Sequence, residues 1–249
     1  NCSSMTSFPL IDTSSVQTFF DCWFGCSGLT SFPLIDTSSA TSIQRTWFDC
    51  SSLTSFPLIN TSSATNIKRA WQSCSSLTSF PLLNTSSGAS FEFTWFDCSG
   101  LTSFPLIDTS SGTDFKSTWD GCSSLTSFPL IDTSSGTDFA FAWRNCSSLT
   151  SFPLINTTSG TNFRASWQDC SSLTSFPANA FDGNIATNYN QVFLSTNLTT
   201  QSIDNVLVSL DTSGVSNGVF SQSGGSAPSA TGDTAVDNLV IKGWTVTTT

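Results

Sequence analysis

The side chains that could do chemistry in this chain are cysteines and carboxylates, because histidine is absent. Eight of the nine cysteines recur at a constant step of 24 residues, at Cys2, Cys26, Cys50, Cys74, Cys98, Cys122, Cys146 and Cys170. Such a step predicts a column of stacked thiols, whose parallel Cβ vectors suit disulfide geometry poorly. Metal sites built on cysteine usually contain closely spaced pairs, and no CxxC pair occurs. We therefore expect reduced, buried thiols from Cys26 to Cys170, with Cys22 exposed or paired.

The composition argues against an enzyme. Without histidine the most common general base is absent, and a buried thiol is not an activated nucleophile. No glycine-rich phosphate loop and no isolated pair of carboxylates occurs. We predict no catalytic residues and no cofactor.

Aspartate or asparagine occupies one turn position in every repeat, at Asp12, Asp36, Asn60, Asn84, Asp108, Asp132 and Asn156. Stacked carboxylates repel at close range, so the aspartates need hydrogen-bond donors or a cation. We predict that hydroxyl and backbone N–H groups of the turn are the donors. Calcium bound at Asp36, Asp108 and Asp132 is the alternative.

The same step of 24 residues governs tryptophan, from Trp23 to Trp167, and proline, from Pro9 to Pro177. Near-identical coils that stack in a solenoid bury a core that no single coil could bury. We delimit solenoid repeats over residues 1–195, as coils 2–25, 26–49, 50–73, 74–97, 98–121, 122–145, 146–169 and a divergent 170–195, followed by a C-terminal cap over 196–249.

The coil 98–121 predicts the local structure of the others. The string L-x-x-F-x-L that begins at Leu101 alternates as in a leucine-rich-repeat strand. A polar turn follows, and Phe115 and Trp119 then recur at the spacing of a short helix. The predicted fold class is an α/β repeat, a leucine-rich-repeat-like right-handed solenoid of strand–turn–short-helix coils with a small α/β C-terminal cap.

Proline in the middle of each predicted strand cannot donate to a ladder, so a β-helix without helices is the alternative. Successive coils should be related by a translation of about 4.8 Å. For the coil 50–73 and the first residue of the next coil, the residues expected in the core are Leu53, Phe56, Leu58, Ile67, Trp71 and Cys74.

The cap is predicted to contain two helices and two short strands. The helices are expected over 200–210 and over 234–242, the second ended by Gly243. The strands are expected near residue 219 and over 244–248.

The outward positions that repeat in every coil form the candidate binding face, with Ile35 expected to point outward as well. The candidate residues are Thr30, Ser31, Pro33, Thr54, Ser55, Pro57, Thr78, Ser79, Pro81, Thr102, Ser103, Pro105, Thr126, Ser127 and Pro129. Hydroxyl and small apolar groups at constant spacing favour recognition of a cell-surface glycan or protein receptor by many weak contacts. A structural spacer or fibre protein and an ice-binding protein are the alternatives. Sequence variation concentrates on the predicted helix side, which is the face able to discriminate partners.

The charge excludes two classes of partner. The formal net charge is −10 with only 7 basic residues, so the chain has no footprint for nucleic acid or for an anionic membrane. No apolar stretch approaches the roughly 20 residues that span a bilayer, so membrane insertion is not expected.

The string F-x-x-x-W-x-x-C-S-S-L-T-S-F-P-L, from Phe139 to Leu154, resembles the BspA-like leucine-rich repeats of bacterial surface proteins, whose core is F-x-x-C-x-x-L-x-x-L. The form with tryptophan and S-F-P-L is similar to repeats in proteins predicted from marine bacteriophages. The resemblance implies an adhesion protein of a virion tail, fibre or capsid decoration, or of a bacterial surface, with an extracellular or virion-surface location. Because Cys2 opens a full coil, we expect other subunits or preceding residues to cover the N-terminal end.

Overall fold

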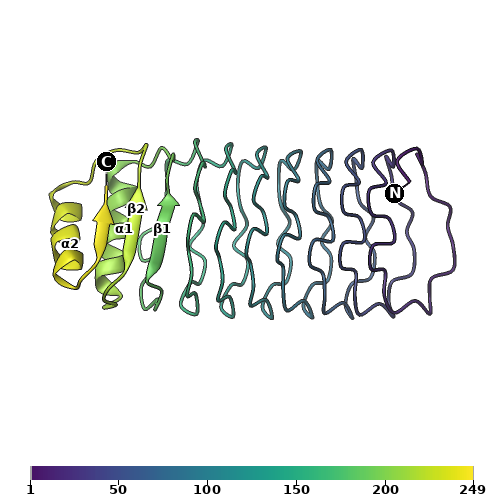
Figure 1. Cartoon of the computed structure of the whole chain (residues 1–249), viewed down its shortest axis with the longest axis horizontal. Helices are drawn as coiled ribbons and strands as arrows, with labels where there is room; N and C mark the ends of the chain where they lie inside the picture. The colour runs from purple at the N-terminus through teal and green to yellow at the C-terminus, as the bar shows by residue number, and fades with distance from the viewer. Residues whose placement is uncertain (1, 249) are drawn as a thin grey trace.

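The structure, a computed structural model, describes residues 2–248 as one row of stacked coils that ends in an α/β cap (Figure 1). Tryptophan rings of successive coils, from Trp23 to Trp167, stack with centroids 5.1–5.9 Å apart. Phenylalanine rings, from Phe32 to Phe176, form a second column and meet the tryptophans edge-on at 4.7–5.5 Å. A third column of stacked phenylalanines runs from Phe91 to Phe163. The predicted solenoid of stacked coils is confirmed, and aromatic columns form much of its core.

One side of each coil carries the hydrogen bonds that join it to the next coil. The N–H groups of Ile43, Arg45, Trp47 and Asp49 donate at 2.8–3.1 Å to carbonyl oxygens of the following coil. The N–H groups of Thr46 and Phe48 turn back to carbonyls three residues earlier in the same coil, to Ile43 and Arg45, both at 3.3 Å. Alternate peptide groups therefore point along the stack and within the coil.

The prediction of a short helix on this side of each coil is wrong. Within residues 2–248 the helices are confined to the cap, and the coils contain turns and isolated parallel bridges such as Ser42–Asn66. Two residues in each of the seven regular coils have a positive φ, for example Arg45 at 54° and Asp49 at 58°. A left-handed residue breaks a helix. Repeated tight turns place Ile43 and Trp47 on one side, and this spacing imitates a helical pattern.

The extended segment on the other side of the coil, residues 29–35 and their equivalents, is not the ladder strand that the sequence predicted. At most coil junctions it forms one backbone bond, as from Thr54 N to Thr30 O at 3.2 Å. Between coils 146–169 and 170–195 it forms three, with a parallel bridge between Ser151 and Ser175. Proline lies outside the main ladder, so its missing N–H removes no bond from it.

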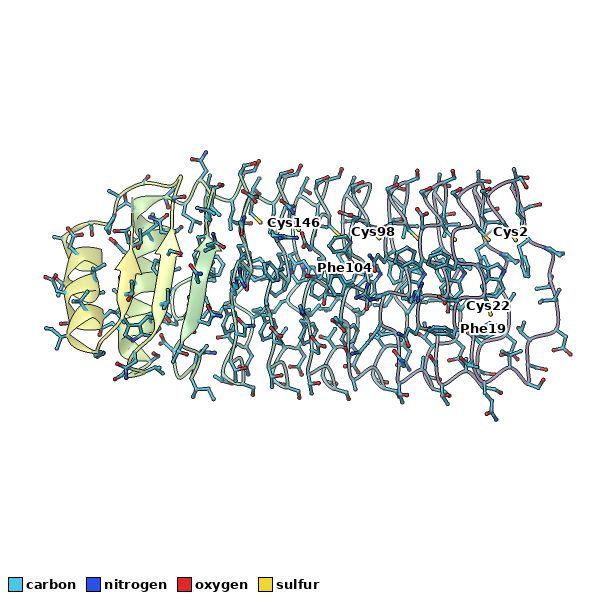
Figure 2. All side chains as sticks on the ribbon, viewed as in Figure 1. Cys2, Phe19, Cys22, Cys98, Phe104 and Cys146 are labelled. Carbon is cyan, nitrogen blue, oxygen red and sulfur yellow. The ribbon has the colours of Figure 1, made fainter. Side chains whose placement is uncertain are left out.

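The cysteines behave as the sequence predicted. Cys26 to Cys170 are buried free thiols, whereas Cys2 and Cys22 are exposed free thiols. Figure 2 shows Cys2, Cys98 and Cys146 along one line of the stack, with Cys22 set apart from it. The sulfurs from Cys50 to Cys170 donate to the carbonyl of the tryptophan 27 residues earlier, as Cys50 Sγ does to Trp23 O at 3.2 Å. Burial raises the pKa of the Cys50 thiol to about 12, so it is not an activated nucleophile at neutral pH.

The cap continues the ladder and replaces the extended segment by helices. Strands β1 (Asn188–Phe193), β2 (Val219–Gln222) and β3 (Thr245–Thr247) form a parallel sheet in the order β1–β2–β3, and Asn162 of the last regular coil pairs with Asn188. Helices α1 (Thr200–Thr212) and α2 (Ala230–Ile241) connect them (Figure 1).

Helix α1 stacks on the last extended segment, where Ser202 Oγ donates to Thr174 O and accepts from Phe176 N, both at 3.1 Å. The predicted helices and short strands of the cap are present, although α2 starts four residues earlier than expected because Ser229 caps it. Gly243, with φ 83°, follows its end. Over the described residues no helix is long and apolar enough to cross a membrane.

Candidate binding surfaces

The predicted binding residues lie together along one side of the stack. Thr30, Ser31 and their equivalents are exposed, and the prolines from Pro33 to Pro177 beside them are half-buried. Each threonine hydroxyl donates to the threonine carbonyl of the preceding coil, at 3.2 Å for Thr54 and 3.3 Å for Thr102 and Thr126. The hydroxyls therefore share one orientation, and a regular array results.

Leucine, not isoleucine, completes this surface. The residues Leu10, Leu34, Leu58, Leu82, Leu106, Leu130 and Leu154 are 50–73% exposed. The isoleucine or leucine that follows each, from Ile35 to Ile155, is at most 5% exposed. The predictions that Leu58 is buried and that Ile35 points outward are therefore wrong. Burial of Leu53, Phe56, Ile67, Trp71 and Cys74 is confirmed.

A tight turn explains why the leucine is exposed and the residue after it is buried. The N–H of Ile59 donates to Pro57 O at 2.9 Å, two residues back, and the same bond recurs at Ile107 and Ile131. An i to i−2 bond closes a γ-turn, which interrupts the alternation of an extended strand. The central leucine of the turn points outward and the next residue enters the core. We call the row of exposed leucines, together with the Thr30 and Ser31 positions, the leucine face.

The row of aspartates and asparagines borders this face, and its side chains bond to the turns as predicted. Asp12, Asp36, Asp108 and Asp132 each accept from the backbone N–H two residues later, at 2.9–3.0 Å. Hydrogen bonds from the serine in the turn lower the pKa of these carboxyl groups. Calcium at Asp36, Asp108 and Asp132 is the alternative that the sequence left open, and within residues 2–248 no group of three or more histidine, cysteine, aspartate or glutamate side chains gathers.

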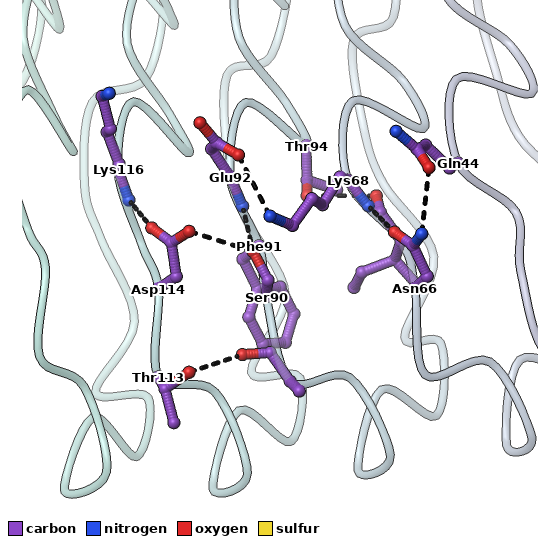
Figure 3. Close-up of polar contacts among 12 residues, drawn as sticks. Gln44, Asn66, Lys68, Ser90, Phe91, Glu92, Thr94, Thr113, Asp114 and Lys116 are labelled. Atoms are coloured by element: carbon purple, nitrogen blue, oxygen red, sulfur yellow. Dashed lines mark hydrogen bonds and ion pairs between the residues drawn. The ribbon is translucent and has the colours of Figure 1, made fainter.

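The other long side carries the residues that vary between coils. We call residues 20–25 and their equivalents 44–49, 68–73, 92–97, 116–121, 140–145 and 164–169 the ladder face. It contains every basic residue of the chain except Lys242. Its carboxylates are Asp21, Asp49, Glu92, Asp97, Asp120 and Asp169. Figure 3 shows part of this side, where Lys68 forms an ion pair with Glu92 of the next coil at 3.2 Å.

Aromatic rings and guanidinium groups meet on the ladder face. Arg45 lies over Phe24 at 4.9 Å and within 5.8 Å of Phe20 and Phe48. The other contacts are Arg69 over Phe93 at 4.3 Å and Phe141 between Arg144 and Arg164, at 4.8 and 5.5 Å. Cation–π contacts at partly exposed sites contribute about 0.5–1 kcal/mol each.

Two columns of left-handed residues run along this face and differ in composition. The column two residues after each tryptophan contains Gly25, Asp49, Ser73, Asp97, Gly121, Asn145 and Asp169. The column two residues before it contains Asp21, Arg45, Arg69, Phe93, Ser117, Phe141 and Ala165. Glycine, asparagine and aspartate tolerate a positive φ, whereas a bulky residue there costs roughly 1 kcal/mol or more. The first column was a sequence signal for turns that the helical spacing concealed.

Catalytic geometry is not evident in the described part of the chain. The buried thiols face tryptophan carbonyls, and the most buried carboxylate, Asp120, is paired with Arg144 at 2.8 Å and bonded to Asn145 at 3.0 Å. Burial raises the pKa of Asp120, against the opposing effect of Arg144. A shallow hollow of about 340 Å³ at the cap is lined by residues such as Asn179, Gln201 and Asn205, and Asp204 in it is engaged by Ser229 of the α2 cap.

No protein-family model matches the chain, and comparison with curated proteins finds no significant relative. Among solved structures, a leucine-rich repeat protein of T. pallidum is similar, with 19% identity, a TM-score of 0.41, and coverage of 76% of this chain and 74% of that chain. An internalin from Listeria monocytogenes has 10% identity and a TM-score of 0.32, over 90% of this chain and 62% of that chain. The BspA-like resemblance therefore stays a prediction.

Proposed function

We propose that this chain is a non-enzymatic adhesion module of a bacterial or virion surface, and that its leucine face binds a receptor through repeated contacts. The observation that carries the proposal is the unbroken row of exposed leucines from Leu10 to Leu154. Large exposed apolar rows are uncommon on soluble proteins and mark interaction sites. Beside them stand the hydroxyls of the Thr30 and Ser31 positions, which add a polar contact in each coil.

The receptor class that fits is a glycan or protein with a repeat of its own, because identical coils offer identical contacts. Each contact is weak, and simultaneous engagement of several coils raises the overall affinity. The leucine face and its border carry Asp12, Asp36, Asp108 and Asp132 but no lysine or arginine. This charge disfavours a strongly anionic receptor.

In the finer form of the proposal the module belongs to a phage tail, fibre or capsid decoration. Other subunits of that assembly would then be its structural partners.

Ice binding is a second candidate, favoured by one observation. The hydroxyls from Thr54 to Thr174 are held in the same orientation by bonds of 3.2–3.4 Å to the preceding coil. A rigid array of hydroxyl groups at constant spacing could also match the regular surface of an ice crystal. Shaped ice crystals would favour this function over adhesion.

The test compares two variants that remove the same number of exposed apolar side chains. The face variant replaces Leu58, Leu82, Leu106 and Leu130 by serine. The control replaces Ile185, Val208, Val240 and Ile241 by serine as well. These four residues are 39–83% exposed and lie outside the leucine face.

Retention is measured on a glycan array and on a panel of bacterial cells. We expect wild type and control to be retained alike, and the face variant to bind at least about tenfold more weakly, since several coils lose a contact together. Equal retention of the two variants would rule out the leucine face. A wild-type chain that binds nothing and shapes no ice would favour the spacer.

A further inference from the structure

The ladder face contains a column of side chains that the backbone disfavours. Arg45, Arg69, Phe93 and Phe141 all have φ between 54° and 61°, where glycine or asparagine would be at ease. The parallel column after the tryptophans uses glycine, asparagine, aspartate and serine at the same kind of position. The fold therefore does not require arginine or phenylalanine there. Backbone strain retained at a surface position indicates a role for the side chain itself.

The disfavoured side chains gather into arginine–phenylalanine clusters on the surface. Phe20, in the first cluster with Arg45, is 49% exposed. Phe93 packs against Arg69 of the preceding coil and lies 5.5 Å from Phe96. Arginine and aromatic side chains are enriched among residues that dominate the energy of protein interfaces.

The charges of the face indicate which partner it would accept. Arg45, Lys68 and Arg144 are engaged in ion pairs with Asp21, Glu92 and Asp120, at 3.2, 3.2 and 2.8 Å. Over residues 2–248, Arg69, Lys116 and Arg164 have no ion-pair partner in the chain. Three cations on alternate coils thus remain available to a ligand, between carboxylates that would repel a polyanion.

We propose that the ladder face is a second interaction surface, distinct from the leucine face, and that its partner is a protein surface presenting separate carboxylates among apolar groups. The partner carboxylates pair with Arg69, Lys116 and Arg164, and its apolar groups pack on Phe93 and Phe141. Because these residues differ from coil to coil, the partner binds in one register. The leucine face, by contrast, is alike in every coil.

The experiment uses the full chain and three substitutions, Arg69→Asn, Phe93→Asn and Phe141→Asn, combined in one variant. Asparagine tolerates a positive φ, so the variant should fold and keep or raise its Tm. The matched control is Ser73→Asn, which introduces the same residue at a left-handed position of the same face.

The probe is a random peptide library displayed on phage, selected on the immobilised wild-type chain. We expect enriched peptides that combine aspartate or glutamate with aromatic residues. A synthetic copy should bind the triple variant at least about tenfold more weakly than wild type or control.

Three results would overturn the inference. One is the absence of enrichment, or enriched peptides that bind the triple variant as well as they bind wild type. Another is a clearly lowered Tm of the triple variant, which would mean that these side chains serve stability. The third is self-association of the wild-type chain that the triple variant loses, because the occupant would then be a second copy.

Discussion

Ile107→Ala should destabilise the chain by about 2–5 kcal/mol, whereas Leu106→Ala should change its stability by less than about 0.5 kcal/mol. The neighbours differ because Ile107 is 2% exposed and Leu106 is 61% exposed. The bond from Ile107 N to Pro105 O, at 2.9 Å, sets this arrangement. Truncation of the isoleucine leaves a cavity in the stack, whereas truncation of the leucine removes only a surface contact.

Urea unfolding of the two variants measures the difference. Leu130→Ala and Ile131→Ala, one coil further on, repeat the comparison in an equivalent setting, with 62% and 2% exposure. If both positions lose the same free energy of unfolding, or if the leucine position loses more, the γ-turn is contradicted. The alternating strand that the sequence predicted would then be supported.

Gly136→Ala should destabilise the chain by about 1–3 kcal/mol, and a second substitution, Phe139→Ile, should relieve much of that loss. A Cβ at residue 136 would lie 2.3 Å from Phe139 Cζ and 3.0 Å from Phe115 Cε2. Neither ring can move freely, since each is stacked between neighbours, Phe139 at 5.3 Å from Phe115 and 5.1 Å from Phe163.

The chain itself contains both solutions to this packing constraint. Coils with isoleucine at the ring position carry alanine at the glycine position, as in the pairs Ala40 with Ile43 and Ala64 with Ile67. Four coils with phenylalanine carry glycine, at Gly88, Gly112, Gly136 and Gly160, whereas the first coil combines Phe19 with Val16.

A double-mutant cycle of Gly136→Ala and Phe139→Ile, followed by urea unfolding, measures the coupling. Phe139→Ile alone loses two ring contacts, so the double variant should be less stable than wild type but more stable than the sum of the single losses implies. We expect a coupling free energy of about 1–3 kcal/mol. Additive losses would mean that the glycine is not there to make room for the ring.

Which residues enter the core at each repeat was largely predictable from the sequence, but the path of the backbone between them was not. Trp71, Cys74 and Leu53 are locked to the repeat step and apolar, so burial follows from type and period alone. The Pro57–Leu58–Ile59 segment could not be oriented from alternation, because a γ-turn depends on a local bond that apolar pattern does not reveal. The helix was predicted from spacing that tight turns also produce.

The candidate surfaces were predictable to different degrees. Exposure of Thr30 and Ser31 was predicted correctly, but the leucines that make this surface apolar were assigned to the core. The ladder face was recognised as the variable side. Its arginine–phenylalanine clusters were not predicted, because the partners come from different coils, as with Arg69 and Phe93.

The central claim is that several near-identical coils bind one receptor at the same time through the leucine face. The dependence of the affinity on the number of coils tests this claim most directly. Deleting coils 74–97 and 98–121 as whole units of 24 residues leaves the step of the ladder intact. Retention on the receptor cells or glycan found for the wild type is then compared between the full and shortened arrays. We predict that affinity falls steeply with each deleted coil, by more than about tenfold for the pair. Equal affinity of the full and shortened arrays would contradict the claim and assign binding to the cap or to a single coil.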